Sequence, residues 1–136
     1  MIIHQNSIIK LEYNPATDIL DVKYPDLQKF MLLEIKESLK LLVSTVRNYD
    51  VKRLLLDASH TIIEINEEEN RELTFYLATE LSKTRLQKLA RIKPADPNKE
   101  ARAQENIKEI EKSGTIPFLV RTFSSKTEAI NWLIIK

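Results

Sequence analysis

The stretch "KRLLLD", residues 52–57, holds three consecutive leucines between charged residues. A short uninterrupted apolar run is typical of a strand that is covered on both faces, as in a parallel sheet. Asp57 would then stand at the carboxyl end of this strand, with Ser59 and His60 close behind it. The stretch therefore predicts a central parallel strand. It also places these three polar residues where open α/β sheets bind their ligands.

The sequence before this strand predicts a hairpin and a helix. Residues 7–13 and 19–24 both alternate between apolar and polar side chains, and the turn-forming "NPATD" lies between them. Apolar residues then recur at helical spacing over roughly 30–48. We therefore expect an antiparallel pair of strands followed by a helix that crosses over to the central strand.

The sequence after the central strand alternates between helical and strand patterns. The expected elements are a helix from a capping box at Asn66 and Glu69 to about residue 83, a strand at 86–92, a helix from Asp96 to Gly114, a strand at 115–123 and a short helix opened by Ser125 and Glu128. This order predicts one α/β domain over residues 1–136. Its mixed, mainly parallel sheet would have about five strands, an N-terminal antiparallel hairpin and four helices.

Two residue counts exclude several classes of site. Cysteine is absent, so the chain has no disulfide, thiolate nucleophile or cysteine zinc site. Its one glycine is Gly114, and phosphate-binding loops need glycine because their backbone approaches the phosphate closely. A P-loop and a Rossmann dinucleotide site are thereby excluded, and we expect no cofactor.

Charge and hydropathy limit the classes of partner that the chain is expected to bind. The net charge is +1, so no overall positive field attracts nucleic acid. The apolar runs are far shorter than the ~20 residues that cross a bilayer. The N-terminus lacks the pattern of a signal peptide. We expect a cytoplasmic protein without nucleic-acid binding or membrane insertion.

The residues after the central strand do not predict catalysis. Ser59 and His60 are adjacent, so in extended backbone their side chains point to opposite sides and do not form a triad with Asp57. The chain's two histidines, His4 and His60, have no carboxylate partner at metal-ligand spacing. We predict no enzymatic activity. Asp57 is interpreted as an acceptor for backbone amides in the turn, with a ligand crevice as the alternative role for Asp57, Ser59 and His60.

The chain resembles the STAS family, the fold of anti-sigma-factor antagonists, and especially its divergent bacterial STAS/SEC14-like relatives. The similar segments are "LEYNPATDILDVKY" (11–24), "YDVKRLLLDAS" (49–59), "LARIKP" (89–94) and "RTFSSKTEAINWL" (121–133). The resemblance implies a small cytoplasmic domain that binds proteins, nucleotides or lipids. The phospho-switch of some members needs a hydroxyl where this chain has "EINEEEN" (64–70), so no such switch is expected.

Two side chains predict a contact surface. Phe75 lies about 160–200° from the apolar stripe of its helix, and Leu41 is also off the stripe of the preceding helix. Glu68 and Glu72 would form a polar rim around Phe75. The leading hypothesis is a non-enzymatic interaction module that associates with itself or with another protein. The alternative is a carrier or sensor of a small apolar or amphipathic ligand, held between the sheet and its helices.

The charges are unevenly distributed along the chain. Residues 57–80 are mostly acidic and residues 83–102 mostly basic. Neighbouring elements that neutralise each other would explain this pattern, and so would complementary patches on two subunits. The sequence favours neither explanation.

Overall fold

The computed structural model describes residues 1–28, 31–114 and 116–135. Within these ranges the strands are β1 Ile2–Gln5, β2 Lys10–Asn14, β3 Ile19–Lys23, β4 Arg53–Asp57, β5 Lys88–Ile92 and β6 Leu119–Phe123. The helices are α1 Leu32–Asn48, α2 Glu67–Leu81, α3 Pro97–Ser113 and α4 Lys126–Ile134. None of the helices in this part of the chain is both long and apolar enough to cross a bilayer.

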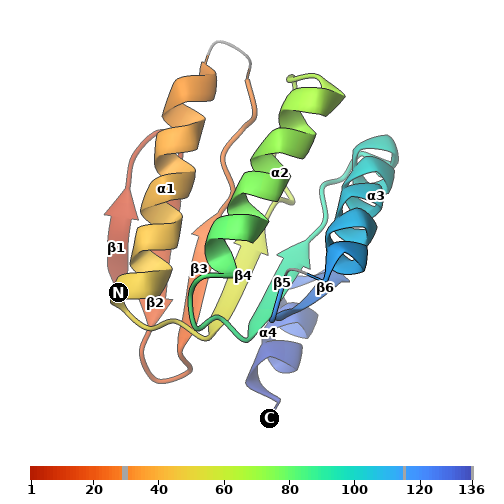
Figure 1. Ribbon diagram of the computed structural model, residues 1–136. Coiled ribbons are helices and arrows are strands. Elements are labelled where there is room, and N and C mark those ends of the chain that lie inside the picture. Colours follow the sequence, from red (N-terminus) through yellow and green to blue (C-terminus); the bar gives the residue numbers. More distant parts are fainter. Residues whose placement is uncertain (29–30, 115, 136) are drawn as a thin grey trace.

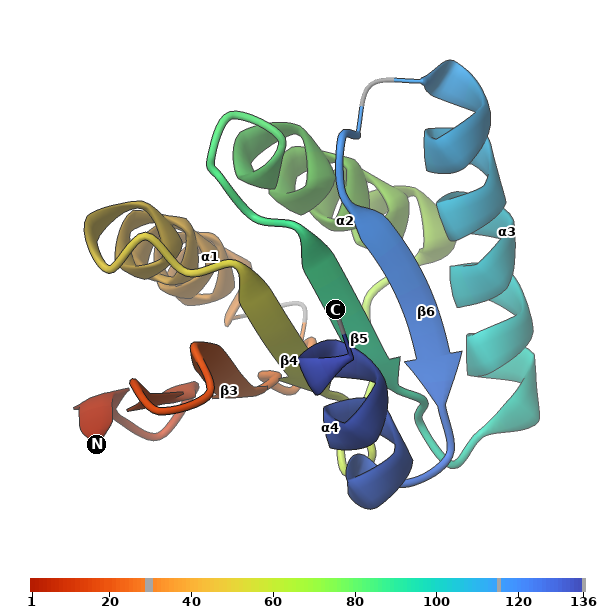
Figure 2. The same cartoon turned by 90° about the horizontal axis from the view of Figure 1, so that it is seen from below.

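The strands form a single sheet whose spatial order repeats their order in the chain, β1-β2-β3-β4-β5-β6. The β1–β2 and β2–β3 pairs are antiparallel, and the pairs from β3 to β6 are parallel. Helices α1, α2 and α3 lie side by side over one face (Figure 1). Helix α4 covers the other face at β4 and β5 (Figure 2). The predicted mixed α/β fold with an N-terminal hairpin and four helices is confirmed.

The three leucines of β4 divide between the two faces of the sheet. Leu54 and Leu56 belong to the main core beneath α1 and α2, whereas Leu55 packs in a second cluster with Ala129 and Leu133 of α4. Successive side chains of a strand alternate in direction, so a strand covered on both sides must be apolar at every position. This explains the continuous apolar run that marks β4 in the sequence.

The helix ends follow the local signals in the sequence. Asn66 and Glu69 form the reciprocal capping box of α2, and the Asp96 side chain accepts a hydrogen bond from the Asn98 backbone amide at the start of α3. Gly114 adopts a left-handed conformation with φ 68° and ends α3. The Glu128 backbone amide donates to the Ser125 hydroxyl at the start of α4. These predicted helix starts and the predicted end of α3 are confirmed.

The sheet has one more strand than the approximately five that the sequence suggests. Strand β1 pairs with β2 and contains an irregularity between Ile2 and His4. A four-residue edge strand with such a break has no regular alternation to reveal it. The predicted helix over 30–48 and the predicted strand over 115–123 each begin at a residue that lies outside the described part of the chain.

Candidate functional site

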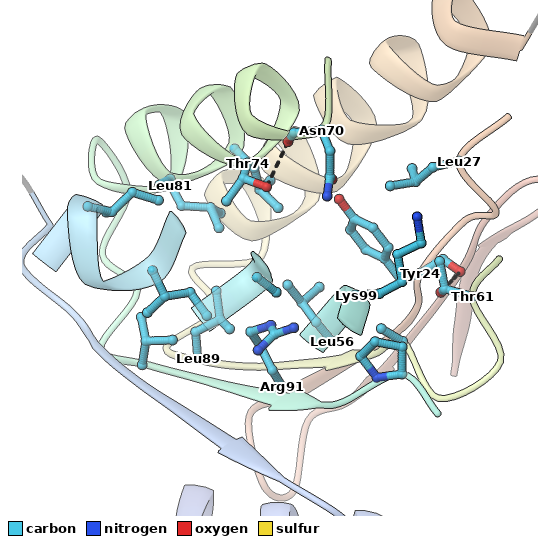
Figure 3. Close-up of a pocket in the computed structure, with 18 of the residues that line it drawn as sticks. Tyr24, Leu27, Leu56, Thr61, Asn70, Thr74, Leu81, Leu89, Arg91 and Lys99 are labelled. Carbon is cyan, nitrogen blue, oxygen red and sulfur yellow. Dashed lines mark hydrogen bonds between the residues drawn. The ribbon is translucent and has the colours of Figure 1, made fainter. Parts of the chain in front are cut away.

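A pocket lies on the face of the sheet that carries α2 and α3. Its walls come from β4, β5 and β6 below, α2 and α3 above, and the segments that follow β3 and β4 (Figure 3). The lining is mainly apolar, with Leu56, Leu77, Leu81, Leu89, Ala103, Ile107, Ile110, Ile116, Phe118 and Val120 among its residues. The empty space between these walls measures about 930 Å³, a figure that includes space open to solvent.

The pocket exists because α3 does not fill the space beneath it. Ile110 is the one buried residue among the described residues of this helix. The other members of its narrow apolar stripe, Ala103 and Ile107, line the pocket and remain half-exposed. Alanine is too short to reach the sheet, so the layer between α3 and β6 is incompletely packed.

Polar contacts hold α3 to the sheet at the side of the pocket. The Arg91 guanidinium of β5 donates to both carboxylate oxygens of Glu100, at 3.0 and 3.4 Å, and to the Thr122 hydroxyl at 2.9 Å. Gln104 donates to Glu100 at 2.6 Å and to Thr122 at 3.0 Å. The side chains of Arg91 and Glu100 are 15% and 14% exposed. Here a largely buried ion pair fastens a helix that has little apolar contact.

Ion pairs also join α3 to α2. Arg71 contacts Glu109 at 2.5 Å, and Arg102 contacts Glu67. The hydrogen bond with Arg71 lowers the pKa of Glu109 below its ordinary value. The Arg102–Glu67 pair joins the acidic segment to the basic segment within one chain. The Arg71–Glu109 pair instead joins a base of the acidic segment to an acid beyond the basic segment.

Polar side chains gather at one end of the pocket. Tyr24, Asn70 and Lys99 lie there, with the Asn70 amide and the Tyr24 hydroxyl pointing toward each other (Figure 3). Tyr24 keeps some accessible surface because it borders the pocket, but the protein around it removes water. Desolvation raises the pKa of its phenol to about 12, and the positive charge of Arg91 opposes this rise. The tyrosine is a neutral hydrogen-bonding group near neutral pH.

The segment after β4 positions this tyrosine. The Thr61 hydroxyl donates to the Tyr24 carbonyl oxygen at 3.2 Å, and the Tyr24 amide donates to the Asp57 carbonyl oxygen at 2.9 Å. The Ile62 amide donates to the Asp26 carboxylate at 2.9 Å. The turn that attracts attention in the sequence therefore contributes structurally to the pocket wall.

The candidate crevice residues do not line the apolar pocket, although the hollow that Asp57 and His60 border shares Tyr24 and Thr61 with it. The Asp57 carboxylate accepts hydrogen bonds from the Ser59 amide at 3.0 Å and the Ser59 hydroxyl at 2.6 Å. It therefore provides the acceptor for two donors in the turn after β4. His60 is exposed and, with Asp57, borders a polar hollow near the β1–β2 turn. Because the strand order never reverses, the sheet has no switch point of the kind that opens a ligand crevice at strand ends.

The candidate interaction residues lie on α1 and α2. Phe75 is half-buried, and the Arg71 guanidinium lies over its ring, 4.5 Å from the centroid. Leu41 is half-buried and packs against the main core. Glu68 and Glu72 are exposed. Leu41 therefore contributes to the fold, and Phe75 is partly covered by a cation from its own helix.

No group of histidine and carboxylate side chains suited to a metal ion occurs within the described residues. No protein-family model matches the chain, and no curated protein or solved structure is significantly similar to it. The sequence alone did not single out Tyr24, Asn70, Arg91 and Lys99 as candidate site residues. A signal that could have indicated this place is the small number of apolar residues on α3, Ala103, Ile107 and Ile110, which is too few to fill the space above the sheet.

Proposed function

We propose that the protein is a non-enzymatic carrier or sensor of a small amphipathic ligand, which it holds between the sheet and helices α2 and α3. The observation that carries this proposal is the incompletely filled apolar space under α3. Its lining is apolar at one end and polar at the other. A gap in a core costs stability because its walls lose contacts. A bound apolar chain would restore those contacts and gain about 0.8 kcal/mol for each buried methylene.

The experiment uses the neutral fluorescent dye N-phenyl-1-naphthylamine, whose emission rises in apolar surroundings. Ala103→Phe adds a ring to the wall of the pocket. Ala101→Phe makes the same change at an exposed position of the same helix, and serves as the matched control. We expect the wild type and Ala101→Phe to bind the dye, and Ala103→Phe to lose at least tenfold in affinity, the equivalent of about 1.4 kcal/mol.

Two results would contradict the proposal. One is a wild-type protein that does not enhance the dye's emission. The other is an Ala103→Phe variant that binds as tightly as the control. If Ala103→Phe fails to fold, the wild type still provides a test, because amide resonances of Ala78, Ala103 and Val120 should shift on dye addition. A native mass spectrum of the purified protein should show a constant added mass if a ligand is retained.

The second candidate is the STAS-like interaction module. The observation that favours it is Phe75, which lies outside both apolar clusters on a face shared with Arg71. Aromatic and arginine side chains together are typical of interface centres. Analytical ultracentrifugation of the wild type and Phe75→Lys tests it. A wild type that remains monomeric at high concentration, or a variant that dimerises as tightly, would contradict self-association through this residue.

A further inference from the structure

We infer that the ligand is a single-chain amphiphile with an anionic head, and that Lys99 is its counter-ion. This inference rests on the proposed function and adds the chemical class of the ligand. It is drawn from three features: a cation without a partner at the pocket wall, neutral hydrogen-bonding groups beside it, and a gradient of polarity along the pocket.

Lys99 is the cation of the pocket that has no protein partner. It is half-buried, lines the pocket, and makes no ion pair or hydrogen bond with any residue in the described part of the chain. Arg91, the other cation in the lining, is already engaged by Glu100. An ammonium beside apolar walls gains from an anion there, because the low local dielectric strengthens their attraction.

Lys99 also borders a polar hollow between α2 and α3, and several carboxylates line that hollow. Glu67 contacts Arg102, and Glu69 accepts a hydrogen bond from the Asn66 amide in the capping box. Glu100 is bonded by Arg91 and Gln104. Glu68 and Glu105 line the hollow as well, but no ion pair joins either of them to Lys99, so its charge is available to a ligand that enters between α2 and α3.

Two neutral donors stand beside this lysine. In Figure 3 the Tyr24 hydroxyl and the Asn70 side-chain amide point toward each other, and Lys99 extends alongside Tyr24. Neither of these two side-chain groups is hydrogen-bonded to a described residue. A phenol, an amide and an ammonium together provide the donors that a carboxylate or phosphate oxygen accepts.

The rest of the pocket becomes apolar with distance from this cluster. Asn70 lies in the first turn of α2 and Leu81 at its last residue, which at 1.5 Å per residue are about 16 Å apart. Figure 3 shows the polar cluster at one side and Leu81 with Leu89 at the other. A ligand would thus place its head near the N-terminal ends of α2 and α3. Its chain would run toward their C-terminal ends.

The test compares two amphiphiles that differ in the head. Sodium dodecanoate and dodecan-1-ol, both below the concentration at which they aggregate, compete with N-phenyl-1-naphthylamine for the pocket. Lys99→Gln removes the proposed counter-ion, and Lys108→Gln makes the same change at an exposed position of α3 outside the pocket. Dodecyl phosphate, as a third competitor, distinguishes a phosphate head from a carboxylate.

We expect dodecanoate to bind the wild type at least tenfold more tightly than dodecanol. Lys99→Gln should remove that preference with dodecanol affinity unchanged, and Lys108→Gln should preserve it. Equal affinity of the charged and neutral amphiphiles, or a preference that survives Lys99→Gln, would overturn the anionic head and leave the carrier function standing. Absence of dye binding would instead reject the carrier function itself.

Discussion

Helices α1 and α3 are both 17 residues long and lie on the same face of the sheet, yet they are held in different ways. The buried residues of α1 are Ile35, Ser38, Leu39, Leu42, Val43, Thr45 and Val46, whereas α3 buries Ile110 alone among its described residues. Helix α1 is attached by apolar burial. Helix α3 is attached by ion pairs and hydrogen bonds at its margins, and the space beneath it is the candidate ligand site.

This difference separates two tasks within one layer. Apolar packing is stabilising in proportion to the area it removes from water, and it leaves no room for a ligand. An ion pair such as Arg91–Glu100 can hold a helix at a fixed distance from the sheet without filling the space between the helix and the sheet. The N-terminal part of the layer is thus closely packed, whereas the C-terminal part leaves an unfilled space under α3.

The largest effect should come from truncating the core face of α1. Leu39→Ala removes a fully buried side chain and should lower the free energy of unfolding by about 2–5 kcal/mol. Ile107→Ala on α3 removes a half-exposed side chain and should cost about 1 kcal/mol or less. Urea denaturation of both variants measures the two values. Equal losses would show that α3 is packed like α1.

A smaller effect should follow from breaking the clamp on α3. Glu100→Gln keeps the shape of the side chain but leaves Arg91 without its anionic partner, and should cost about 1–3 kcal/mol, since the pair is largely but not fully buried. Glu105→Gln alters an exposed residue of the same helix and serves as the control. Thermal unfolding gives the comparison. A Glu100→Gln variant as stable as its control would show that the clamp does not hold α3.

The smallest effect concerns the exposed pair Arg71–Glu109. Contact with Arg71 lowers the pKa of Glu109, so this pair stabilises the fold above the ordinary carboxyl pKa of 4.5 and loses its contribution as pH falls through the lowered value. Arg71→Gln should therefore reduce the melting temperature slightly near neutral pH, and the reduction should disappear in acid and in molar salt. A reduction that persists in both conditions would mean that Arg71 acts by packing on Phe75 instead.

The sequence predicts those parts of the molecule that depend on neighbouring residues. Asn66 with Glu69, and Gly114, determine helix ends through contacts within a few residues, and each lies where its pattern indicates. The consecutive leucines of β4 indicate that the strand is covered on both faces, because successive side chains point to opposite faces of the sheet. Such signals are local, so one sequence is enough to read them.

The pocket depends on residues that are distant in the sequence. Tyr24, Asn70 and Lys99 come from three separate segments, and their assembly follows from the register of the sheet and the position of α3. In the sequence Lys99 belongs to a basic segment in which most side chains resemble ordinary surface lysines and arginines. Only the position of α3 relative to the sheet shows that the Lys99 ammonium borders an apolar space, whereas other basic side chains of this segment face solvent.

The strictly sequential order of the strands has a consequence for how the chain reaches this fold. Each parallel pair is joined by one crossover helix, so no strand has to insert between two others that have already paired. The chain closes comparatively short loops at each step, and the entropic cost of pairing distant segments stays low. Refolding should therefore be fast for a mainly parallel sheet, because every new strand adds to an edge that is already formed.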